Sequence, residues 1–583
     1  MNGSAELQCS KWYTLFKIKS PGRNITHVKF INLIISNSNI VVRLDQGTLS
    51  ELVLQNVVVR NNQIGLYSKN SIYCSVLMIN TTFEHNSFGR IQLQCLNLTA
   101  NIMSSIFKLT PVLLKNIGGK PSRLQNMQIW VENTIVDVDN TQICLEMFAI
   151  EPVTATLNVT ITNSQFKNHI ANCKFVKDGI STLHINSRHI SIEVYLKIFL
   201  SNLLFQNNNS TRPVLVLSPG YQQSTEVEII LRGSTFRNNS VALWVGPYCH
   251  GFPVEISSIT LENYTFVDNF YEQFKATGAA AIYFATGTSH VSACRFVDNK
   301  AGKNPFTGVV TISKSARVTF SDTYFENKQT EFQSNQLFSL GNQKFRFVGH
   351  NTFNLIGLKE KQSVFIRVPM ALNTGVIIDK NFNVLCPQGF KLNPQLFCSP
   401  LKSRNICYYI NIKCEQCPLK TYTTQRGELV FNKSNNIHCE QCPRGGNCEN
   451  GLVKAKPNFW GYKTTKRVNF VQCPPGYCCD YEDCITYYSC RGKRSGTLCG
   501  QCPPGMSEGL FSTHCISNTK CSISSVFILG VTGMLVLYLV FFLWHREIVT
   551  YLKKNLFSKR SLFSISGRTE QGNNSNTDVS SPS

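Results

Sequence analysis

Short apolar stretches that alternate with polar residues recur along the first two thirds of the chain. Examples are "ELVLQNVVV" at 51–59, "ATLNVTIT" at 155–162 and "TEVEIIL" at 225–231. A period of two is typical of β-strands, and the Asn, Ser, Gly and Asp clusters between these stretches are typical of turns. Before residue 520 no stretch has convincing helical periodicity. The pattern therefore predicts an all-β region.

A Phe followed three residues later by an Asn recurs within this region. The strict pairs are Phe83/Asn86, Phe205/Asn208, Phe236/Asn239, Phe266/Asn269 and Phe296/Asn299, and the last four Phe residues are spaced by 31, 30 and 30. Looser members are Val59/Asn62, Phe107/Thr110, Trp130/Asn133, Phe166/Asn168 and Phe325/Asn327. The early steps from Val59 to Trp130 are 24, 24 and 23 residues. Such a period indicates a repeat architecture.

Strand-rich repeats of this length predict a parallel β-helix. Each coil would lie about 4.8 Å from the next, with the Phe residues stacked in one interior column. We expect the Asn to occupy a turn, where it tolerates the left-handed conformation, and to form a ladder with the Asn of the next coil. The alternative is a β-sandwich with Asn-rich turns, but a sandwich does not repeat one residue pair every 30 residues.

The repeats resemble those of chlamydial polymorphic outer-membrane proteins, in which a G-G-A-I tetrapeptide precedes F-x-x-N. Here "GAAAI" at 278–282 precedes Phe296 and "GVVTI" at 308–312 precedes Phe325. The resemblance covers residues 25–360 and implies a right-handed parallel β-helix. An outer-membrane barrel does not follow in the sequence, so the bacterial surface role does not transfer with the fold.

Cysteine usage indicates an oxidising compartment. Seventeen of the 24 Cys lie in one segment: Cys386, Cys398, Cys407, Cys414, Cys417, Cys439, Cys442, Cys448, Cys473, Cys478, Cys479, Cys484, Cys490, Cys499, Cys502, Cys515 and Cys521. Nine N-x-S/T sequons agree with this compartment. They begin at Asn24, Asn80, Asn97, Asn158, Asn208, Asn209, Asn238, Asn263 and Asn432.

Two chemistries are open to these cysteines. Cys414, Cys417, Cys439 and Cys442 have nearly zinc-ribbon spacing. However, the repeated C-x-x-C-P unit resembles the disulfide-bonded modules of ephrin-receptor-like and tumour-necrosis-factor-receptor-like ectodomains, and we predict disulfides without metal. The C-x-x-C at Cys499 and Cys502 is open to a redox interpretation, but a structural bridge is expected. Because seventeen is odd, one Cys must pair elsewhere or stay free, and we expect it at Cys478 or Cys479.

The segment "SGTLCGQCPPG" at 495–505 is similar to a juxtamembrane signature of uncharacterised surface proteins of early-branching animals. Those proteins join a β-helix to a cysteine-rich stalk and transmembrane helices. Residues 522–544 form an uncharged stretch long enough to span a bilayer. Basic residues follow it more densely than they precede it, which places the C-terminus in the cytosol. The predicted domains are a β-helix at 1–385, a stalk at 386–521, a helix at 522–544 and a tail at 545–583.

The two ends of the sequence carry further expectations. The first residues lack the features of a signal peptide, so we expect a truncated N-terminus. The basic beginning of the tail is expected to lie against anionic lipid headgroups, and the remainder is polar and expected to be disordered. The net charge is +23. Nucleic acid is excluded by the compartment, and we interpret the charge as scattered surface charge.

Three classes of function fit these observations. The first is a single-pass plasma-membrane receptor or adhesin that binds an extracellular protein or glycan through the solenoid, with no cofactor and no catalysis. The second is a β-helix enzyme acting on polysaccharides, for which Asp137 and Asp139 are the best carboxylate pair. The third is a structural spacer. Because the later coils are longer than the early ones, we expect the binding loops at residues 205–350.

Overall fold

The structure is a computed structural model of the 583-residue chain. It describes residues 5–8, 14–18, 26–44, 49–86, 91–117, 125–153, 155–171, 180–186, 195–210, 212–218, 226–246, 258–271, 278–301, 307–327, 335–339, 345–355, 362–368, 376–379, 381–401, 404–430, 433–434, 437–465, 467–481, 484–509, 512–520 and 525–558. The described part is all-β apart from one long helix. It contains a parallel β-helix, a disulfide-rich region and one apolar C-terminal helix, as the sequence predicts.

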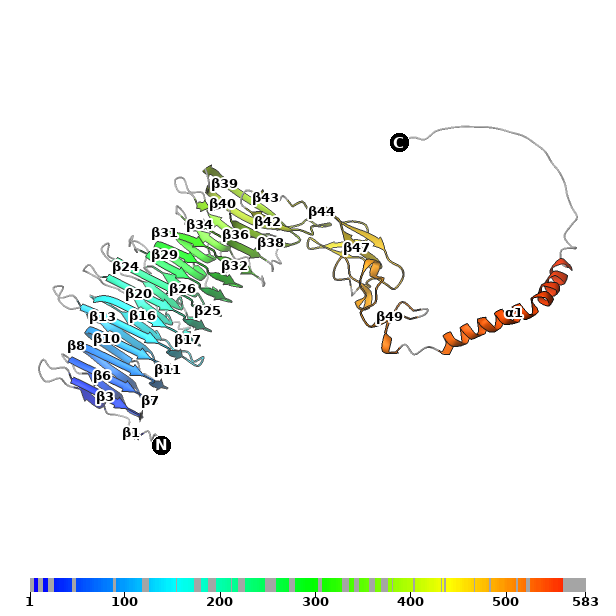
Figure 1. Ribbon diagram of the computed structural model, residues 1–583. Coiled ribbons are helices and arrows are strands. Elements are labelled where there is room, and N and C mark those ends of the chain that lie inside the picture. The colour runs from blue at the N-terminus through cyan, green and yellow to red at the C-terminus, as the bar shows by residue number, and fades with distance from the viewer. Residues whose placement is uncertain are drawn as a thin grey trace. The chain divides into compact units, whose positions relative to one another are not determined.

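The solenoid has three ladders of parallel strands, which can be followed from blue to green in Figure 1. The ladder that carries the Phe residues is called the Phe face. Its parallel strands are β1 (Ala5–Gln8), β4 (Leu33–Ser36), β7 (Val58–Arg60), β9 (Thr82–Glu84), β11 (Ile106–Lys108), β14 (Ile135–Asp137), β17 (Gln165–Lys167), β21 (Leu204–Gln206), β25 (Thr235–Arg237), β28 (Thr265–Val267), β30 (Arg295–Val297), β32 (Tyr324–Asn327), β35 (Asn351–Leu355) and β38 (Phe382–Gln388).

The second ladder is called the Trp130 face. Its strands are β3 (Thr26–Ile31), β6 (Leu49–Gln55), the second halves of β8 (Ile64–Ile79) and β10 (Ile91–Met103), β13 (Gln125–Glu132), β16 (Ala155–Thr162), β20 (Tyr195–Ser201), β24 (Glu226–Arg232), β27 (Ser258–Glu262), the second halves of β29 (Gly278–Ser292) and β31 (Thr307–Ser321), β34 (Phe345–Val348) and β37 (Val376–Ile378). Coils are numbered along this face, with β3 in coil 1.

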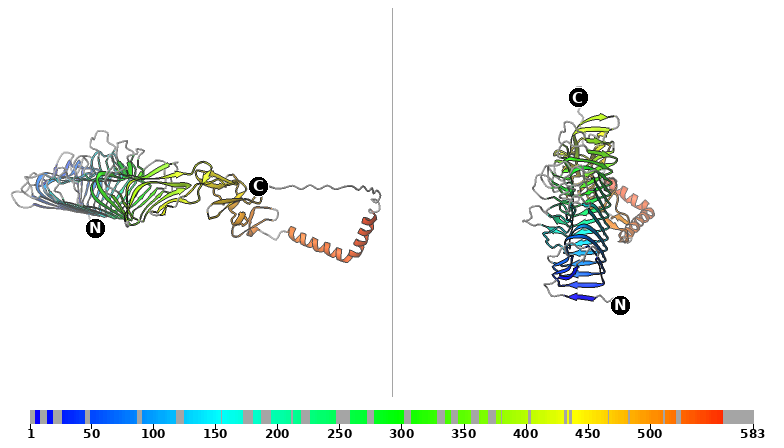
Figure 2. Two further views of the ribbon diagram at one scale, coloured as in Figure 1. Left: turned by 90° about the horizontal axis from the view of Figure 1, so that it is seen from above. Right: turned by 90° about the vertical axis from the view of Figure 1, so that its left-hand side faces the viewer.

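The third face uses the first halves of the four long strands β8, β10, β29 and β31. Its other strands are β2 (Thr14–Ile18), β5 (Ile40–Leu44), β12 (Val112–Asn116), β15 (Phe148–Glu151), β19 (Leu183–Asn186), β23 (Leu215–Ser218), β26 (Leu243–Val245), β33 (Asn335–Ser339) and β36 (Gln362–Val368). A small pair, β18 (Ile170–Ala171) and β22 (Asn209–Ser210), lies between the Phe face and the third face in the chain. Figure 2 shows the stacked strands of this unit from two further directions.

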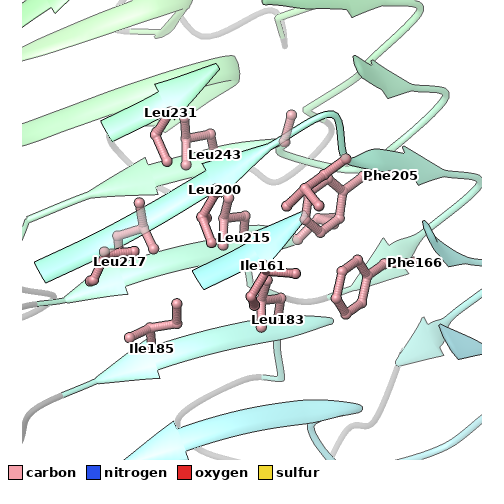
Figure 3. Close-up of a cluster of buried hydrophobic side chains, with 14 of the residues drawn as sticks. Ile161, Phe166, Leu183, Ile185, Leu200, Phe205, Leu215, Leu217, Leu231 and Leu243 are labelled. Atoms are coloured by element: carbon pink, nitrogen blue, oxygen red, sulfur yellow. The ribbon is translucent and has the colours of Figure 1, made fainter. Parts of the chain in front are cut away.

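One interior column follows the middle residue of each Phe-face strand. From coil to coil the paired residues are Ile35, Val59, Phe83, Phe107, Val136, Phe166, Phe205, Phe236, Phe266, Phe296, Phe325, Phe353 and Val384. The predicted stack is confirmed, because the ring centroids of Phe205 and Phe236 lie 4.5 Å apart and those of Phe266 and Phe296 lie 5.0 Å apart. Figure 3 shows Phe166 and Phe205 beside the aliphatic residues of the other faces.

The Asn of F-x-x-N forms a second, polar interior ladder. Asn239 donates from Nδ2 to the carbonyl oxygen of Phe205, at 3.0 Å, and to Oδ1 of Asn269, also at 3.0 Å. Oδ1 of Asn269 also accepts the backbone N–H of Asn239. Asn208 and Asn269 repeat this arrangement in adjacent coils, and Nδ2 of Asn299 donates to the carbonyl oxygen of Phe266 at 2.8 Å. The ladder therefore joins coils through buried amides.

The left-handed residue of this corner is the one before the ladder Asn, so our placement of the αL conformation was wrong by one position. The residues concerned are Asn61, His85, Leu109, Asn168, Asn207, Asn238, Asp268 and Asp298, with φ between 50° and 62°. The ladder position itself tolerates other polar residues. Oγ1 of Thr110 accepts a hydrogen bond from Nδ2 of Asn86 at this position. In the coil of Phe166 the ladder residue, three positions later, is His169.

His169 is fully buried in the ladder. Its backbone N–H donates to Oδ1 of Asn208, and its ring nitrogens contact Oγ1 of Thr182 at 3.0 Å and the carbonyl oxygen of Ile143 at 3.3 Å. Burial disfavours the charged imidazolium and lowers the pKa of His169 to about 4. The sequence indicated Asn168 as the partner of Phe166, but that residue is the left-handed one.

An antiparallel cap ends the parallel solenoid. β39 (Phe390–Leu401) and β40 (Arg404–Gln416) pair with each other, and β40 also pairs antiparallel with β36 and β37. On the Phe face β42 (Arg426–Val430) pairs with β38, and β43 (Lys433–Ser434) pairs with β42. Short strands follow: β41 (Thr421–Tyr422), β44 (Glu440–Gln441), β45 (Gly446–Glu449), β46 (Leu452–Ala455), β47 (Phe459–Lys463) and β48 (Val468–Gln472).

The chain divides into two compact units. The first comprises residues 1–454 and 461–470, and the second comprises residues 455–460 and 471–583. The second unit contains short 3₁₀ turns, the hairpin of β49 (Met506–Glu508) with β50 (Cys515–Ser517), and the helix α1 (Ser525–Ser558). The part of α1 that is long and apolar enough to cross a membrane is Phe527–Asn555. It extends eleven residues beyond the predicted end at residue 544.

Candidate functional site

Trp130 lies on the solvent side of the solenoid. Its neighbours Ile129 and Val131 point inward and are buried, whereas 46% of the Trp130 surface is exposed. Our assignment of Trp130 to the interior column was therefore wrong, and Val136 occupies the column in that coil. The indole Nε1 donates to Oε2 of Glu132 at 3.3 Å. This hydrogen bond orients an exposed Trp in the middle of a strand.

Apolar side chains also face solvent in coils 1–4 of the same ladder. We call Ile31, Val53, Leu77, Ile79 and Met103 the apolar face. Ile31 is 43% exposed, and the other four are partly exposed. Val53 pairs with Leu77 in register, and Ile79 pairs with Met103. Ile31 is a diagonal neighbour of Val53, and Leu77 and Ile79 lie two residues apart in one strand, so the five residues are connected through direct and diagonal pairs. Trp130 in coil 5 is a diagonal neighbour of Met103.

Coils 9–11 carry polar residues at the equivalent outward positions, whereas coils 7, 8 and 12 carry Phe199, Ile230 and Val348 there. The polar residues are Thr260, Glu262, His290, Ser292, Thr319 and Ser321. Single exposed apolar residues are normal on protein surfaces, but a contiguous apolar surface with polar surroundings indicates an interaction site. The contrast within one ladder shows that strand structure alone does not require apolar residues at these positions.

Charged and amide side chains border the apolar face. His27 contacts Glu51 at 2.7 Å, Lys29 precedes Val53 in the same row, and Gln55 separates Ile31 from Ile79. An apolar centre with a polar rim is the usual composition of protein interfaces. We did not predict this face from the sequence. Its signal was the alternation within the strands, because Leu52, Leu54, Val76 and Met78 are the inward set and leave Val53, Leu77 and Ile79 outside.

In the predicted carboxylate pair Asp137/Asp139, hydrogen bonds and an ion pair hold the side chain of Asp137. Oδ1 of Asp137 accepts the backbone N–H of Asp139 and Nδ2 of Asn168, both at 3.0 Å. Oδ2 of Asp137 lies 3.6 Å from Nζ of Lys167. These contacts hold the corner of the coil together. Asp139 itself has a left-handed backbone and is exposed.

The candidate glycosylation residues lie in three kinds of environment. Asn208 is fully buried in the amide ladder, which disfavours it as an acceptor in the folded solenoid. The exposed residues are Asn80, Asn158, Asn209, Asn238 and Asn263, and Asn97 is partly exposed. Asn24 and Asn432 lie outside the described residues. Exposure is compatible with modification at the remaining positions, which stay predictions.

Disulfides pair most cysteines of the stalk. The pairs are Cys386–Cys414, Cys417–Cys439, Cys442–Cys448, Cys473–Cys478, Cys479–Cys484, Cys490–Cys499 and Cys502–Cys515. Cys398 and Cys407 lie opposite each other in β39 and β40, and Cys521 lies outside the described residues. In the solenoid Cys74 pairs with Cys95, Cys144 is also bonded, and Cys294 is free and buried.

These pairs bear on three predictions. The four cysteines with zinc-ribbon spacing are distributed over three separate disulfides, and in the described ranges no three His, Cys, Asp or Glu residues gather as a metal site. Cys499 and Cys502 have different partners, so their C-x-x-C is structural. The expectation of an unpaired Cys478 or Cys479 was wrong, since both are bonded.

Arg494 is a structural residue that no sequence motif indicated. Its guanidinium carbon lies 4.0 Å from the centre of the Tyr477 ring, and only 3% of its side chain is exposed. Nε donates to the carbonyl oxygen of Cys499 and Nη1 to that of Thr513, both at 2.7 Å. The Arg in front of "SGTLCGQC" therefore ties two disulfide loops together.

Comparison of the chain with family models, with curated proteins and with solved structures found no significant match in any of the three. The fold is thus defined by its own coils, and the family resemblances remain predictions. The apolar helix and the disulfides, which are typical of extracellular proteins, fit a membrane-anchored surface protein.

Proposed function

We propose that the protein is a single-pass cell-surface receptor or adhesin that binds an extracellular protein through the apolar face of coils 1–4. The helix would anchor it in the plasma membrane, with the solenoid outside and the C-terminus in the cytosol. The observation that carries the proposal is the connected solvent-facing set of Ile31, Val53, Leu77, Ile79 and Met103, at positions that are polar in coils 9–11.

The composition of this face favours a protein partner over a charged polysaccharide. Apolar side chains at the centre gain free energy when a partner removes them from water, and Lys29, Glu51 and Gln55 at the rim are suited to hydrogen bonds. Asp137, the best acid for an enzyme, is held by Lys167 and Asn168. This supports binding without catalysis.

A matched pair of variants tests the proposal. Full-length protein displayed on cells is screened against a panel of secreted and surface proteins, and each binder is measured with Leu77→Ser/Met103→Ser and with the control Thr260→Ala/Thr319→Ala. The control changes two positions of later coils that lie in the row of Leu77. We expect the first variant to weaken binding at least about tenfold, as for hot-spot residues, and the control to leave it unchanged.

Other outcomes support the other two functions. If both variants bind every partner as the wild type does, the apolar face is not the recognition surface, and the spacer function gains support. Product release from a polyuronide would support the enzyme. The binding loops expected at 205–350 lie largely outside the described residues, and deletion of these loops tests that prediction separately.

A further inference from the structure

Three consecutive coils of the Trp130 face carry a small side chain between two aromatic ones. In register, Trp130 of coil 5 pairs with Thr160 of coil 6, and Thr160 pairs with Phe199 of coil 7. All three side chains point outward, because their neighbours Ile129, Ile161 and Leu200 are buried. Figure 3 shows Ile161 and Leu200 on the inward side of these strands.

Asn158 lies in coil 6, two residues before Thr160 in strand β16. It pairs with Gln128 on one side and with Lys197 on the other. Trp130, Tyr195 and Phe199 are therefore its diagonal neighbours, at a separation of about 7–8 Å, which long side chains can cross. Tyr195 is 38% exposed and donates to Glu228 at 3.1 Å. Exposed aromatic surface thus lies on both sides of Asn158.

The sequence around Asn158 is a sequon with a suitable geometry. In Asn158-Val159-Thr160 the middle residue points into the core and is buried, so the Asn and the Thr share the outward side. Other exposed sequon residues differ in their contacts. Nδ2 of Asn80 donates to Asn56, and Nδ2 of Asn238 donates to Asn207, within ladders at the corners of the solenoid. Neither contact involves an aromatic ring.

We propose that Asn158 carries an N-linked glycan whose first N-acetylglucosamine packs over Thr160, between Trp130 and Phe199. In the attachment, Nδ2 of Asn158 forms a bond to the anomeric carbon of a lipid-pyrophosphate-linked oligosaccharide. The bond from that carbon to the pyrophosphate breaks, the pyrophosphate leaves with the electron pair, and the amide loses one proton. The inference concerns modification and does not rest on the proposed binding function.

The packing follows from the chemistry of both partners. One face of a pyranose ring consists mainly of C–H groups, and aromatic rings are large, flat apolar surfaces with a polarised face. Trp130 is already oriented by Glu132, so little conformational freedom remains to be lost. A sugar at this position covers the indole that is otherwise half exposed. The sugar would also lie next to the apolar face and would leave the residues of coils 1–4 exposed to solvent.

Site variants of the full-length chain, expressed in eukaryotic cells, test the attachment. Occupancy of Asn158 is measured by mass spectrometry of its peptide, together with gel mobility. We expect a glycan on the wild type and on Thr160→Ser, which keeps the hydroxyl of the sequon. Thr160→Ala and Asn158→Gln should each lose one glycan. An unmodified Asn158 in the wild type overturns the proposal.

The packing is tested by the rate at which a peptide:N-glycosidase removes the glycan from the native protein. Trp130→Ala/Phe199→Ala should raise the release rate at Asn158 by about tenfold. The reason is that the sugar then no longer packs against the aromatic rings of the folded protein and is more accessible to the enzyme. The rate at the exposed Asn263 is the control and should not change, which also shows that the variant is folded. Equal release at Asn158 in the wild type and in the double variant refutes the packing, whatever the occupancy.

Discussion

Replacement of one ladder amide by an apolar residue of similar size should open the solenoid locally. In Asn269→Leu, Oδ1 of residue 269 is lost, and this oxygen accepts both the backbone N–H and one side-chain N–H of Asn239. Both donors are fully buried. A buried donor without a partner costs about 1–3 kcal/mol, so two donors cost about 2–6 kcal/mol.

Hydrogen exchange measured by mass spectrometry is the suitable assay, because coils of a solenoid open with their neighbours rather than all at once. Backbone amides around Asn239 and Asn269 should lose protection by at least about 30-fold, given a factor of ten for each 1.4 kcal/mol. Amides around Val59 should keep theirs.

The matched control is Asn207→Gly. Asn207 belongs to the exposed ladder, where its Nδ2 donates to Asn168, and its φ of 56° suits glycine. This variant should change protection less than about threefold, as surface substitutions do. If Asn269→Leu loses less than tenfold, or no more than Asn207→Gly, the buried amides do not carry the stability assigned to them.

Three further predictions concern other parts of the molecule. Phe266→Ala should destabilise its own and the adjacent coils by about 3–5 kcal/mol in denaturant unfolding, since the ring is fully buried between Phe236 and Phe296; a cost below 1 kcal/mol would contradict the column. The pKa of His169 is lowered to about 4, so the unfolded chain binds a proton before the folded one as pH falls. The free energy of unfolding should therefore decrease by about 3 kcal/mol between pH 6.5 and 4. His169→Asn should remove that part of the pH dependence, and an unchanged dependence of the free energy of unfolding on pH would refute the assignment. Reduction should slow the stalk segment on gels, and elemental analysis of the oxidised protein should find less than one zinc per chain; bound zinc with four free thiols would contradict the disulfide pairs.

The regular half of the solenoid was predictable from sequence because its coil length is nearly constant. Phe236, Phe266 and Phe296 recur every 30 residues, and coils of equal length pair their strands in the same register, so the three residues lie opposite one another. The column position in coil 5 was not found, because Trp130 with Asn133 imitates the motif and Val136 lacks an Asn. The alternation of Met127, Ile129 and Val131 did contain the information that Trp130 points outward.

Other features depend on tertiary contacts that no sequence spacing reveals. Cys74 and Cys95 are 21 residues apart, which does not equal the 24-residue coil step, because they lie on different ladders of neighbouring coils. The partners of Arg494 come from three separated loops. His169 replaces a ladder Asn by meeting the same backbone hydrogen-bond requirement with a ring, and only the position of Asn208 identifies this substitution.

The stacking of coils also determines how the protein responds to mechanical load. A partner held by coils 1–4 and an anchor at the C-terminal helix would pull on the chain from opposite ends of the solenoid. The force then crosses every rung in turn, and within a rung the parallel strand pairs share it. The rung with the fewest hydrogen bonds sets the force at which the solenoid opens. Cys74–Cys95 bonds coils 3 and 4 covalently, so these two coils would stay joined under load even after the hydrogen bonds between them break.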